Sequence, residues 1–102
     1  MRDIQVTHEP EQQRYAVTVD GRPAGFAAYI PAQGMVVMSH TEVDPAFEGQ
    51  GVGSVLAREA LDDVRSSGAK VMPLCPFILA WIRRHPEYGD LVWNAPRSTA
   101  TD

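Results

Sequence analysis

Apolar and polar positions alternate over most of the first 43 residues, which predicts a series of β-strands. The alternation places these strands at residues 3–8, 13–19, 24–30 and 35–43. Asp20-Gly21, between the second and third strands, is a strong hairpin signal, and Pro31 is expected to end the third strand. The fourth strand is apolar on both faces in its first half, which is typical of a strand inside a sheet.

The second half of the chain changes to a helical period. Residues 52–66 carry one apolar stripe at spacings of three and four, formed by Val52, Val55, Leu56, Ala60, Leu61 and Val64. Gly68 is a suitable residue to follow the end of that helix. The rest of the pattern predicts a strand over residues 70–75, a helix over about residues 77–85 and a last short strand over residues 91–93.

Together these elements predict an α/β (α+β) fold. An antiparallel meander leads into a strand–helix–strand crossover with parallel strands, and a short second helix follows. We expect one domain over residues 1–93 and a polar, flexible C-terminal tail over residues 94–102. In open sheets of this kind, ligands bind where neighbouring strands part at their C-terminal ends. The loop after Val43 and the start of the second helix should therefore meet at one edge.

Composition narrows the function classes. The chain has 102 residues and a formal net charge of −4, which argues against nucleic acid or an anionic membrane as the main partner. Its single cysteine, Cys75, allows no intramolecular disulfide. No stretch approaches the roughly 18 apolar residues that a membrane-spanning helix needs. We expect a soluble, cytoplasmic protein.

Three glycines alternate between the fourth strand and the first helix: Gly49, Gly51 and Gly53. The first turn of a helix has free N–H groups, and glycine lets a phosphate approach the backbone closely. The loop lacks the lysine of a nucleotide-hydrolase P-loop, and its Gly-x-Gly-x-Gly spacing differs from the dinucleotide fingerprint. What remains is a ligand held by its pyrophosphate without metal chemistry, or else a glycine turn without a ligand.

The residues around this loop resemble a known family. Glu48-Gly-Gln-Gly-Val-Gly53 is similar to the cofactor motif of the GNAT acetyltransferase superfamily, Gln/Arg-x-x-Gly-x-Gly/Ala. The likeness to a small, single-domain GNAT-like subfamily is continuous from about His40 to Val92, and it includes His40-Thr-Glu-Val43, Pro73-Leu-Cys-Pro-Phe77 and Arg84-His-Pro-Glu-Tyr88. Glu48 departs from the pattern, because the superfamily has Gln or Arg there.

The resemblance implies acetyl-CoA as the cosubstrate. It implies that the pyrophosphate is held by Gly49, Gln50, Gly51, Val52, Gly53 and Ser54. By the same resemblance, the backbone of Val43 would meet the pantetheine arm, and Arg83 or Arg84 would meet the adenosine phosphates.

Acetyl transfer to an amine requires a group that removes a proton from the amine and a group that protonates the leaving thiolate. Many GNAT enzymes use a tyrosine after the crossover strand, and Leu74–Ala80 contains none. Cys75 stands there instead, as a general acid, a transiently acetylated carrier or simply a small buried residue. His40 or Glu42 is the candidate general base, the alternative being a hydrogen-bonded residue at a strand end.

The resemblance implies one of two functions. The first is an N-acetyltransferase that moves an acetyl group from acetyl-CoA to a small amine or an exposed protein amine. The second is an acyl-CoA-binding module with little or no catalysis, which the missing tyrosine and Glu48 favour.

Overall fold

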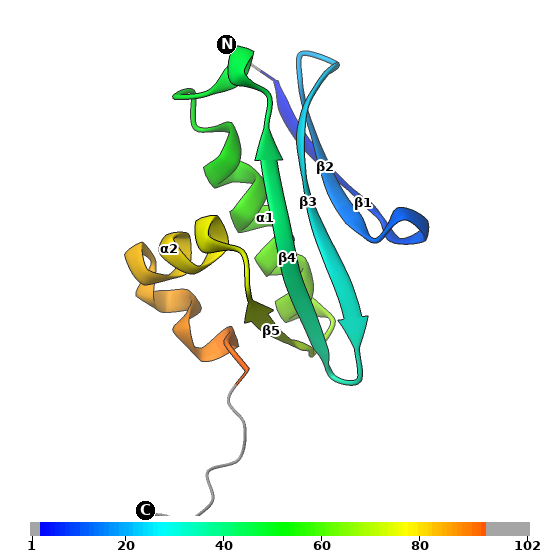
Figure 1. The fold of residues 1–102 in the computed structure, drawn as a ribbon, viewed down its shortest axis with the longest axis vertical. Coiled ribbons are helices and arrows are strands. Elements are labelled where there is room, and N and C mark those ends of the chain that lie inside the picture. Colours follow the sequence, from blue (N-terminus) through cyan, green and yellow to red (C-terminus); the bar gives the residue numbers. More distant parts are fainter. Residues whose placement is uncertain (1–2, 94–102) are drawn as a thin grey trace, which may run out of the picture.

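One five-stranded mixed sheet organises the chain, with the strands in the order β1-β2-β3-β4-β5 (Figure 1). The strands are β1 (Ile4–Glu9), β2 (Arg14–Val19), β3 (Arg22–Ala32), β4 (Met35–Val43) and β5 (Lys70–Pro73). β1 to β4 pair antiparallel, and β5 pairs parallel to β4. The computed structural model describes residues 3–93, so the tail expected at residues 94–102 lies outside the described residues. The predicted meander and parallel crossover are confirmed.

β3 is longer than its sequence pattern predicts, because it continues through Pro31 to Ala32. Register with β2 ends at Ala28, whereas pairing with β4 continues to Ala32. Pro31 therefore lies on a stretch of β3 that has a neighbouring strand on one side. A proline is tolerated there, since its missing N–H removes no hydrogen bond from a second ladder. The hairpin before β3 turns at Asp20 and Gly21, whose φ angles are 50° and 81°, as a two-residue hairpin turn requires.

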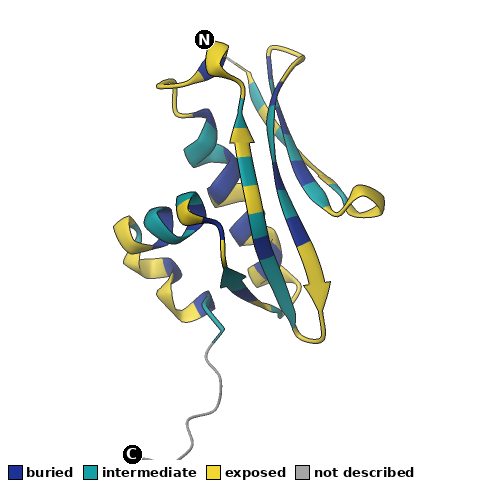
Figure 2. Ribbon diagram, in the orientation of Figure 1, coloured by how far each residue is buried: buried dark blue, intermediate teal, exposed yellow. Residues whose placement is uncertain are grey.

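Helix α1 (Val52–Ser66) covers one face of the sheet and contacts all five strands (Figure 1). Its bounds agree with the predicted helix. Its buried side chains are Val52, Leu56, Ala57, Ala60, Leu61 and Val64. They pack on the buried residues of the strands, Tyr15, Val17, Val19, Ala24, Ala27, Tyr29, Met38 and Val71 (Figure 2). Each large aliphatic side chain buried in this layer contributes about 1.5–3 kcal/mol, so this face holds the core.

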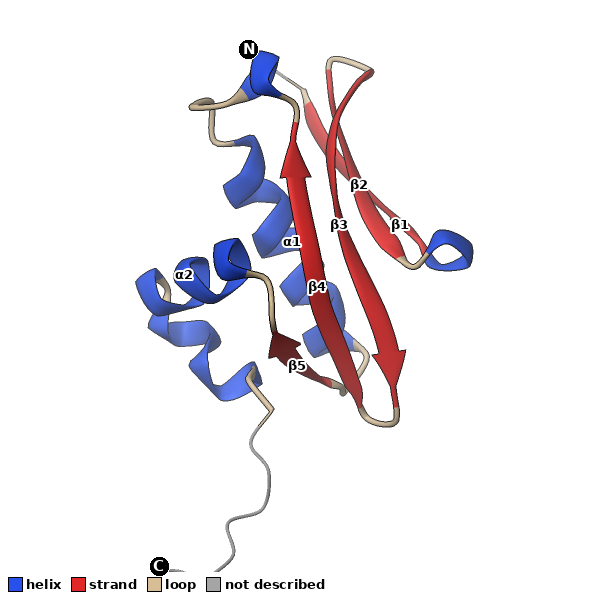
Figure 3. Cartoon of the chain, viewed as in Figure 1, coloured by secondary structure: helices blue, strands red, loops and turns tan. Residues whose placement is uncertain are grey.

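Helix α2 (Pro76–Arg84) begins one residue earlier than predicted and contacts α1, β4 and β5 (Figure 3). It can begin at Pro76 because β5 ends at Pro73 rather than at Cys75. Proline suits the first turn of a helix, where its missing N–H has no partner to lose. The buried face of α2 is formed by Ile78, Trp81 and Ile82.

The strand predicted over residues 91–93 is wrong in its main part. Pro86–Leu91 forms a 3₁₀ helix, η3, which buries Leu91 in the core. A single parallel bridge between Val71 and Val92 remains beside β5, and the Trp93 amide donates to the Val71 carbonyl at 2.7 Å. No helix within residues 3–93 is long and apolar enough to cross a membrane.

A phenol–carboxylate hydrogen bond joins α1 to the sheet. The Tyr15 hydroxyl on β2 donates to Asp63 Oδ2 on α1 at 2.6 Å. Burial of the phenol raises the pKa of Tyr15, and the hydrogen bond to Asp63 raises it further. The pKa values of Tyr29 and Tyr88 are also raised, chiefly by burial. All three phenols therefore hold their protons more tightly in the folded chain than in the unfolded chain.

These shifts predict a loss of stability in alkali. The unfolded chain releases its phenol protons near the ordinary pKa of 10.0, so stability is complete below pH 10 and falls as pH rises above it. Tyr15→Phe should lower the free energy of unfolding by about 1 kcal/mol near neutral pH. Above pH 10 the free energy of unfolding of Tyr15→Phe should fall less steeply than that of the wild type, by up to about 1.4 kcal/mol per pH unit. Urea unfolding over this pH range measures both effects, and equal slopes would contradict the prediction.

Candidate functional site

The site begins where β4 and β5 part. β5 pairs only with Met35–Met38 of β4. At that point the amides of Leu74 and Cys75 both donate to the Met38 carbonyl, at 3.1 and 3.0 Å. Beyond Met38, β4 continues to Val43 with β3 on one side and no strand on the other within the described chain (Figure 1).

A cleft of about 440 Å³ lies beside this unpaired end of β4. We call it the β4–α1 cleft, and its walls come from β4, the glycine loop, the start of α1 and one side of α2. Its lining residues are Thr41, Val43, Phe47, Glu48, Gly49, Gly51, Val52, Gly53, Ser54, Phe77, Trp81 and Arg84. The sequence prediction that the loop and the second helix would meet at one edge agrees with this arrangement.

The loop between β4 and α1 has a defined backbone. Asp44 accepts from the Ala46 amide at 2.9 Å and so begins a 3₁₀ turn, η2 (Pro45–Phe47). Phe47 is buried and holds the loop to the core. Gly49 and Gly51 then take φ angles of 77° and 80°. This left-handed conformation is easily adopted by glycine and strained for most other residues.

The first turn of α1 presents free donors to the cleft. Gly51 is the N-cap residue and offers no side-chain acceptor. Within the described residues, no acceptor takes a hydrogen bond from the amides of Val52, Gly53 or Ser54, and the first bond of the helix runs from the Val55 amide to the Gly51 carbonyl at 3.1 Å. Free amides and the positive end of the helix dipole together favour an anion at this point.

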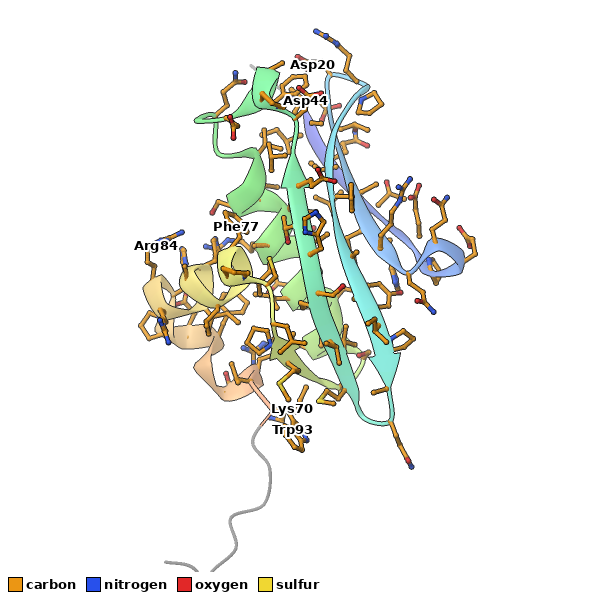
Figure 4. The ribbon with its side chains drawn as sticks, viewed as in Figure 1. Asp20, Asp44, Lys70, Phe77, Arg84 and Trp93 are labelled. Carbon is orange, nitrogen blue, oxygen red and sulfur yellow. The ribbon has the colours of Figure 1, made fainter. Side chains whose placement is uncertain are left out.

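Phe77 closes one side of the cleft. A Cβ placed on Gly53 would lie 2.9 Å from Phe77 Cζ and 3.5 Å from Val43 Cγ2. The phenyl ring therefore lies against the backbone of α1 and close to β4 (Figure 4). Glycine at position 53 allows this close approach, while its backbone conformation is ordinary for a helix. Gly53 thus differs from Gly49 and Gly51, which are required for their φ angles.

Trp81 fixes α2 against the first turn of α1. Its Nε1 donates to Ser54 Oγ at 2.8 Å, and its indole is fully buried. The His85 ring stacks on the indole at 3.8 Å between centroids. The Arg58 guanidinium lies 5.2 Å from the centre of the Trp81 ring. The Ser54 hydroxyl is therefore occupied as an acceptor, and it remains able to donate one hydrogen bond into the cleft.

Most of the residues expected to bind the cofactor line the β4–α1 cleft. They are Val43, Gly49, Gly51, Val52, Gly53, Ser54 and Arg84. Two others do not line it. Gln50 donates from Nε2 to the Ala46 carbonyl at 3.2 Å, which ties its side chain to the loop itself. Arg83 is exposed on α2 and lies outside the lining, whereas its neighbour Arg84 is part of the lining.

The three candidate catalytic residues separate into two groups. Cys75 is buried, and its thiol lies 3.4 Å from the Oγ1 of Thr41, as a donor to that hydroxyl. Thr41 itself lines the cleft, so Cys75 stands directly behind one of its walls. His40 and Glu42 do not line the cleft. Their side chains are about 60% exposed, with His40 Nε2 3.6 Å from Glu42 Oε2.

Strand register explains this separation. Thr41 pairs with the buried Ala27, on the core side of the sheet. His40 and Glu42 pair with Ala28 and Phe26, and the His40 and Phe26 rings are 6.0 Å apart. Alternation along β4 therefore places Thr41 towards the cleft and its two neighbours on the opposite face of the strand.

Several lining residues were missed by the sequence analysis. Thr41 could have been found, because the two-residue period places it on the same face as Val43. Phe77 and Trp81 were identified only as the apolar side of the second helix, and nothing local distinguishes a ring that lines a cleft from one in the core. Among residues 3–93, no three His, Cys, Asp or Glu side chains gather closely enough to hold a metal ion.

Comparison with known proteins identifies the family to which a chain with this fold belongs. The family model for GCN5-related N-acetyl-transferase matches residues 14–91. This chain therefore belongs to the GCN5-related N-acetyltransferase family.

Particular relatives agree with that assignment. Protein NATD1 of Gallus gallus is 30% identical over 86 residues, which cover 81% of this chain and 77% of that protein. Protein NATD1 of Homo sapiens is 29% identical over 86 residues, with 81% and 75% covered. The solution structure of a Staphylococcus aureus protein described as GCN5-like aligns over the whole of both chains with a TM-score of 0.69 at 16% identity, which supports the fold.

The contact between α1 and α2 gives a testable prediction. Ser54→Ala should leave the buried Trp81 Nε1–H without an acceptor, and an unsatisfied buried donor costs about 1–3 kcal/mol. Urea unfolding should show that loss, whereas Ser66→Ala, an exposed serine later on the same helix, should change stability by less than about 0.5 kcal/mol. Equal effects of the two substitutions would show that the Ser54–Trp81 bond contributes nothing.

Proposed function

We propose that this chain is an N-acetyltransferase that moves an acetyl group from acetyl-CoA to a primary amine. The observation that carries the proposal is the set of free amides at Val52, Gly53 and Ser54, which open into the β4–α1 cleft beside the unpaired end of β4. A pyrophosphate needs several donors on one side, and a helix N-terminus supplies them together with a favourable dipole. Family membership gives the proposal its reaction class.

The cofactor would lie in the cleft, with each of its parts against a different wall. The loop from Gly49 to Ser54 would hold the pyrophosphate, and Val43 would offer the free edge of β4 to the pantetheine arm. Arg84 lines the same cleft and would meet a phosphate of the adenosine end. Glu48 also lines the cleft, where its negative charge would oppose phosphate unless the carboxylate points to solvent. The side chains of Gln50 and Arg83 take no part in this arrangement.

The bound thioester supplies an activated acetyl group. The amine nitrogen attacks the thioester carbonyl carbon, the carbon–sulfur bond breaks, and sulfur keeps the electron pair. For an amine that approaches from the face of β4 opposite the cleft, His40 or Glu42 would accept the proton that the amine loses, because both side chains lie on that face. Cys75, beside Thr41, would protonate the departing thiolate or carry the acetyl group for part of the reaction. A reducing compartment such as the cytoplasm suits its free thiol.

A binding module is the second candidate, and one observation favours it. No tyrosine lines the cleft among the described residues. Tyr88, which follows α2, is buried and donates to Asp62 at 2.7 Å while it accepts from Arg58 at 3.2 Å. Its raised pKa, caused first by burial and then by the Asp62 hydrogen bond, keeps the phenol protonated. A domain with this cleft could bind acyl-CoA without turning it over.

Thiol release separates the two candidates. Acetyl-CoA and a panel of primary amines should give free coenzyme A above the rate without protein. Cys75→Ala should lower kcat by about 10²-fold or more if the thiol acts on the sulfur, with the affinity for coenzyme A unchanged in a calorimetric titration. Unchanged turnover in Cys75→Ala would leave the cysteine as a core residue. Binding without turnover of any amine would support the module, and absence of binding would contradict both functions.

Neighbouring arginines on α2 test the placement of the cofactor. Arg84→Ala should weaken coenzyme A binding by about fivefold, the effect of one exposed ion pair of about 1 kcal/mol. Arg83→Ala is the matched control and should leave the affinity unchanged, because Arg83 lies outside the cleft. Raising the salt concentration should reduce the difference between the two variants, since exposed charges are screened. A larger effect of Arg83→Ala would contradict the placement.

A further inference from the structure

Two large apolar side chains are strongly exposed in the part of the chain that the structure describes. Ile30 on β3 is 54% exposed and Leu74 is 65% exposed. A single exposed leucine is common on protein surfaces, so exposure alone carries no argument. The position of Leu74 does, because it lies between the end of β5 and Cys75, where β4 and β5 part.

The backbone beneath Leu74 is fixed. Its amide donates to the carbonyls of Met38 and Met72, both at 3.1 Å, and the next amide, that of Cys75, donates to Met38 at 3.0 Å. The Cys75 side chain is buried against Thr41, and Pro76 begins α2 directly afterwards. The exposed leucine therefore projects from an anchored backbone and not from a loop end. A fixed apolar surface can select a partner without an ordering cost.

The backbone connects Leu74 with the segments that carry both groups of candidate catalytic residues. It precedes Cys75 in the chain, and its amide bonds to Met38, two residues before His40 on β4. Thr41 and Cys75 belong to the side of the cleft, while His40 and Glu42 lie on the opposite face of β4. An amine that reaches a thioester in the cleft from the side of His40 and Glu42 would pass this gap between the strands.

From this position we infer that Leu74 is the residue that determines acceptor specificity, and that the acceptor is a primary amine with an aliphatic group beside its nitrogen. This inference rests on the proposed acetyl transfer. The aliphatic group would pack on the Leu74 side chain while the nitrogen attacks the carbonyl carbon, so the transfer itself is unchanged. A polyamine would fit less well, because its further charges need carboxylates, and Glu42, the one acid on β4, lies beside His40 at 3.6 Å.

Methyl NMR tests the contact without requiring turnover. The full chain, labelled at leucine and isoleucine methyl groups, is titrated with 3-methylbutylamine, methylamine and spermidine, alone and with coenzyme A added. We expect a saturable shift of the Leu74 methyl signals with 3-methylbutylamine and none with methylamine, while the Ile30 signals stay constant. No shift at Leu74, or a shift that spermidine produces more strongly, would overturn the inference.

Steady-state kinetics test whether Leu74 sets the preference for aliphatic amines. Wild-type kcat/KM should be about tenfold or more higher for 3-methylbutylamine than for methylamine, the discrimination that a few methylene groups can give in an apolar contact. Leu74→Ala should reduce this ratio at least threefold through KM, and Ile30→Ala, the matched exposed residue, should leave it unchanged. Turnover with equal rates for both amines would overturn the inference and leave acetyl transfer standing. No turnover with any amine would contradict the proposed function, and the methyl titration would then decide the role of Leu74.

Discussion

The carbonyl oxygen of Met38 is the acceptor on which the arrangement of the site depends. A parallel strand pair normally continues through evenly spaced hydrogen bonds. Here the amides of Leu74 and Cys75 both use this single acceptor, so β5 leaves the sheet and α2 begins. The last residues of β4 keep β3 as their partner on one side. If β5 continued beside them, their free edge would be paired and the β4–α1 cleft would be closed.

Helix α1 meets two requirements at once. Its apolar stripe fills the core, and the buried Val52 holds the very first turn to the sheet. That turn nevertheless lacks a side-chain cap, because Gly51 stands at the N-cap position. Most helices satisfy these amides with Ser, Thr, Asp or Asn, and glycine there sacrifices only a few tenths of a kcal/mol. The first turn of α1 is therefore fixed to the core and still has free N–H donors beside the cleft. The loss of local stability is small.

The sequence pattern predicted those features of the fold that depend only on residues close together in the chain. The bounds of α1 and β4 follow from periodicity, and the glycine loop follows from spacing and the residues around it. The course of β3 through Pro31 could not be predicted, because it depends on where β2 stops pairing. Phe77 and Trp81 belong to the lining of the cleft only because α2 packs on the first turn of α1. The placement of His40 away from the cleft could have been predicted, because the two-residue period that puts Thr41 and Val43 on one face puts His40 and Glu42 on the other.

Strand β4 separates two sides of the proposed reaction, since Thr41 faces the cleft and its neighbours His40 and Glu42 face away. If acetyl-CoA occupies the cleft and His40 or Glu42 is the base, the acceptor comes from the side where this pair is about 60% exposed. An exposed site of this kind buries little of a small amine. Discrimination between amines then depends on few contacts, because affinity gained by burial scales with the apolar area removed from water. A single anchored apolar side chain at the gap between the strands would therefore account for a large share of any selectivity.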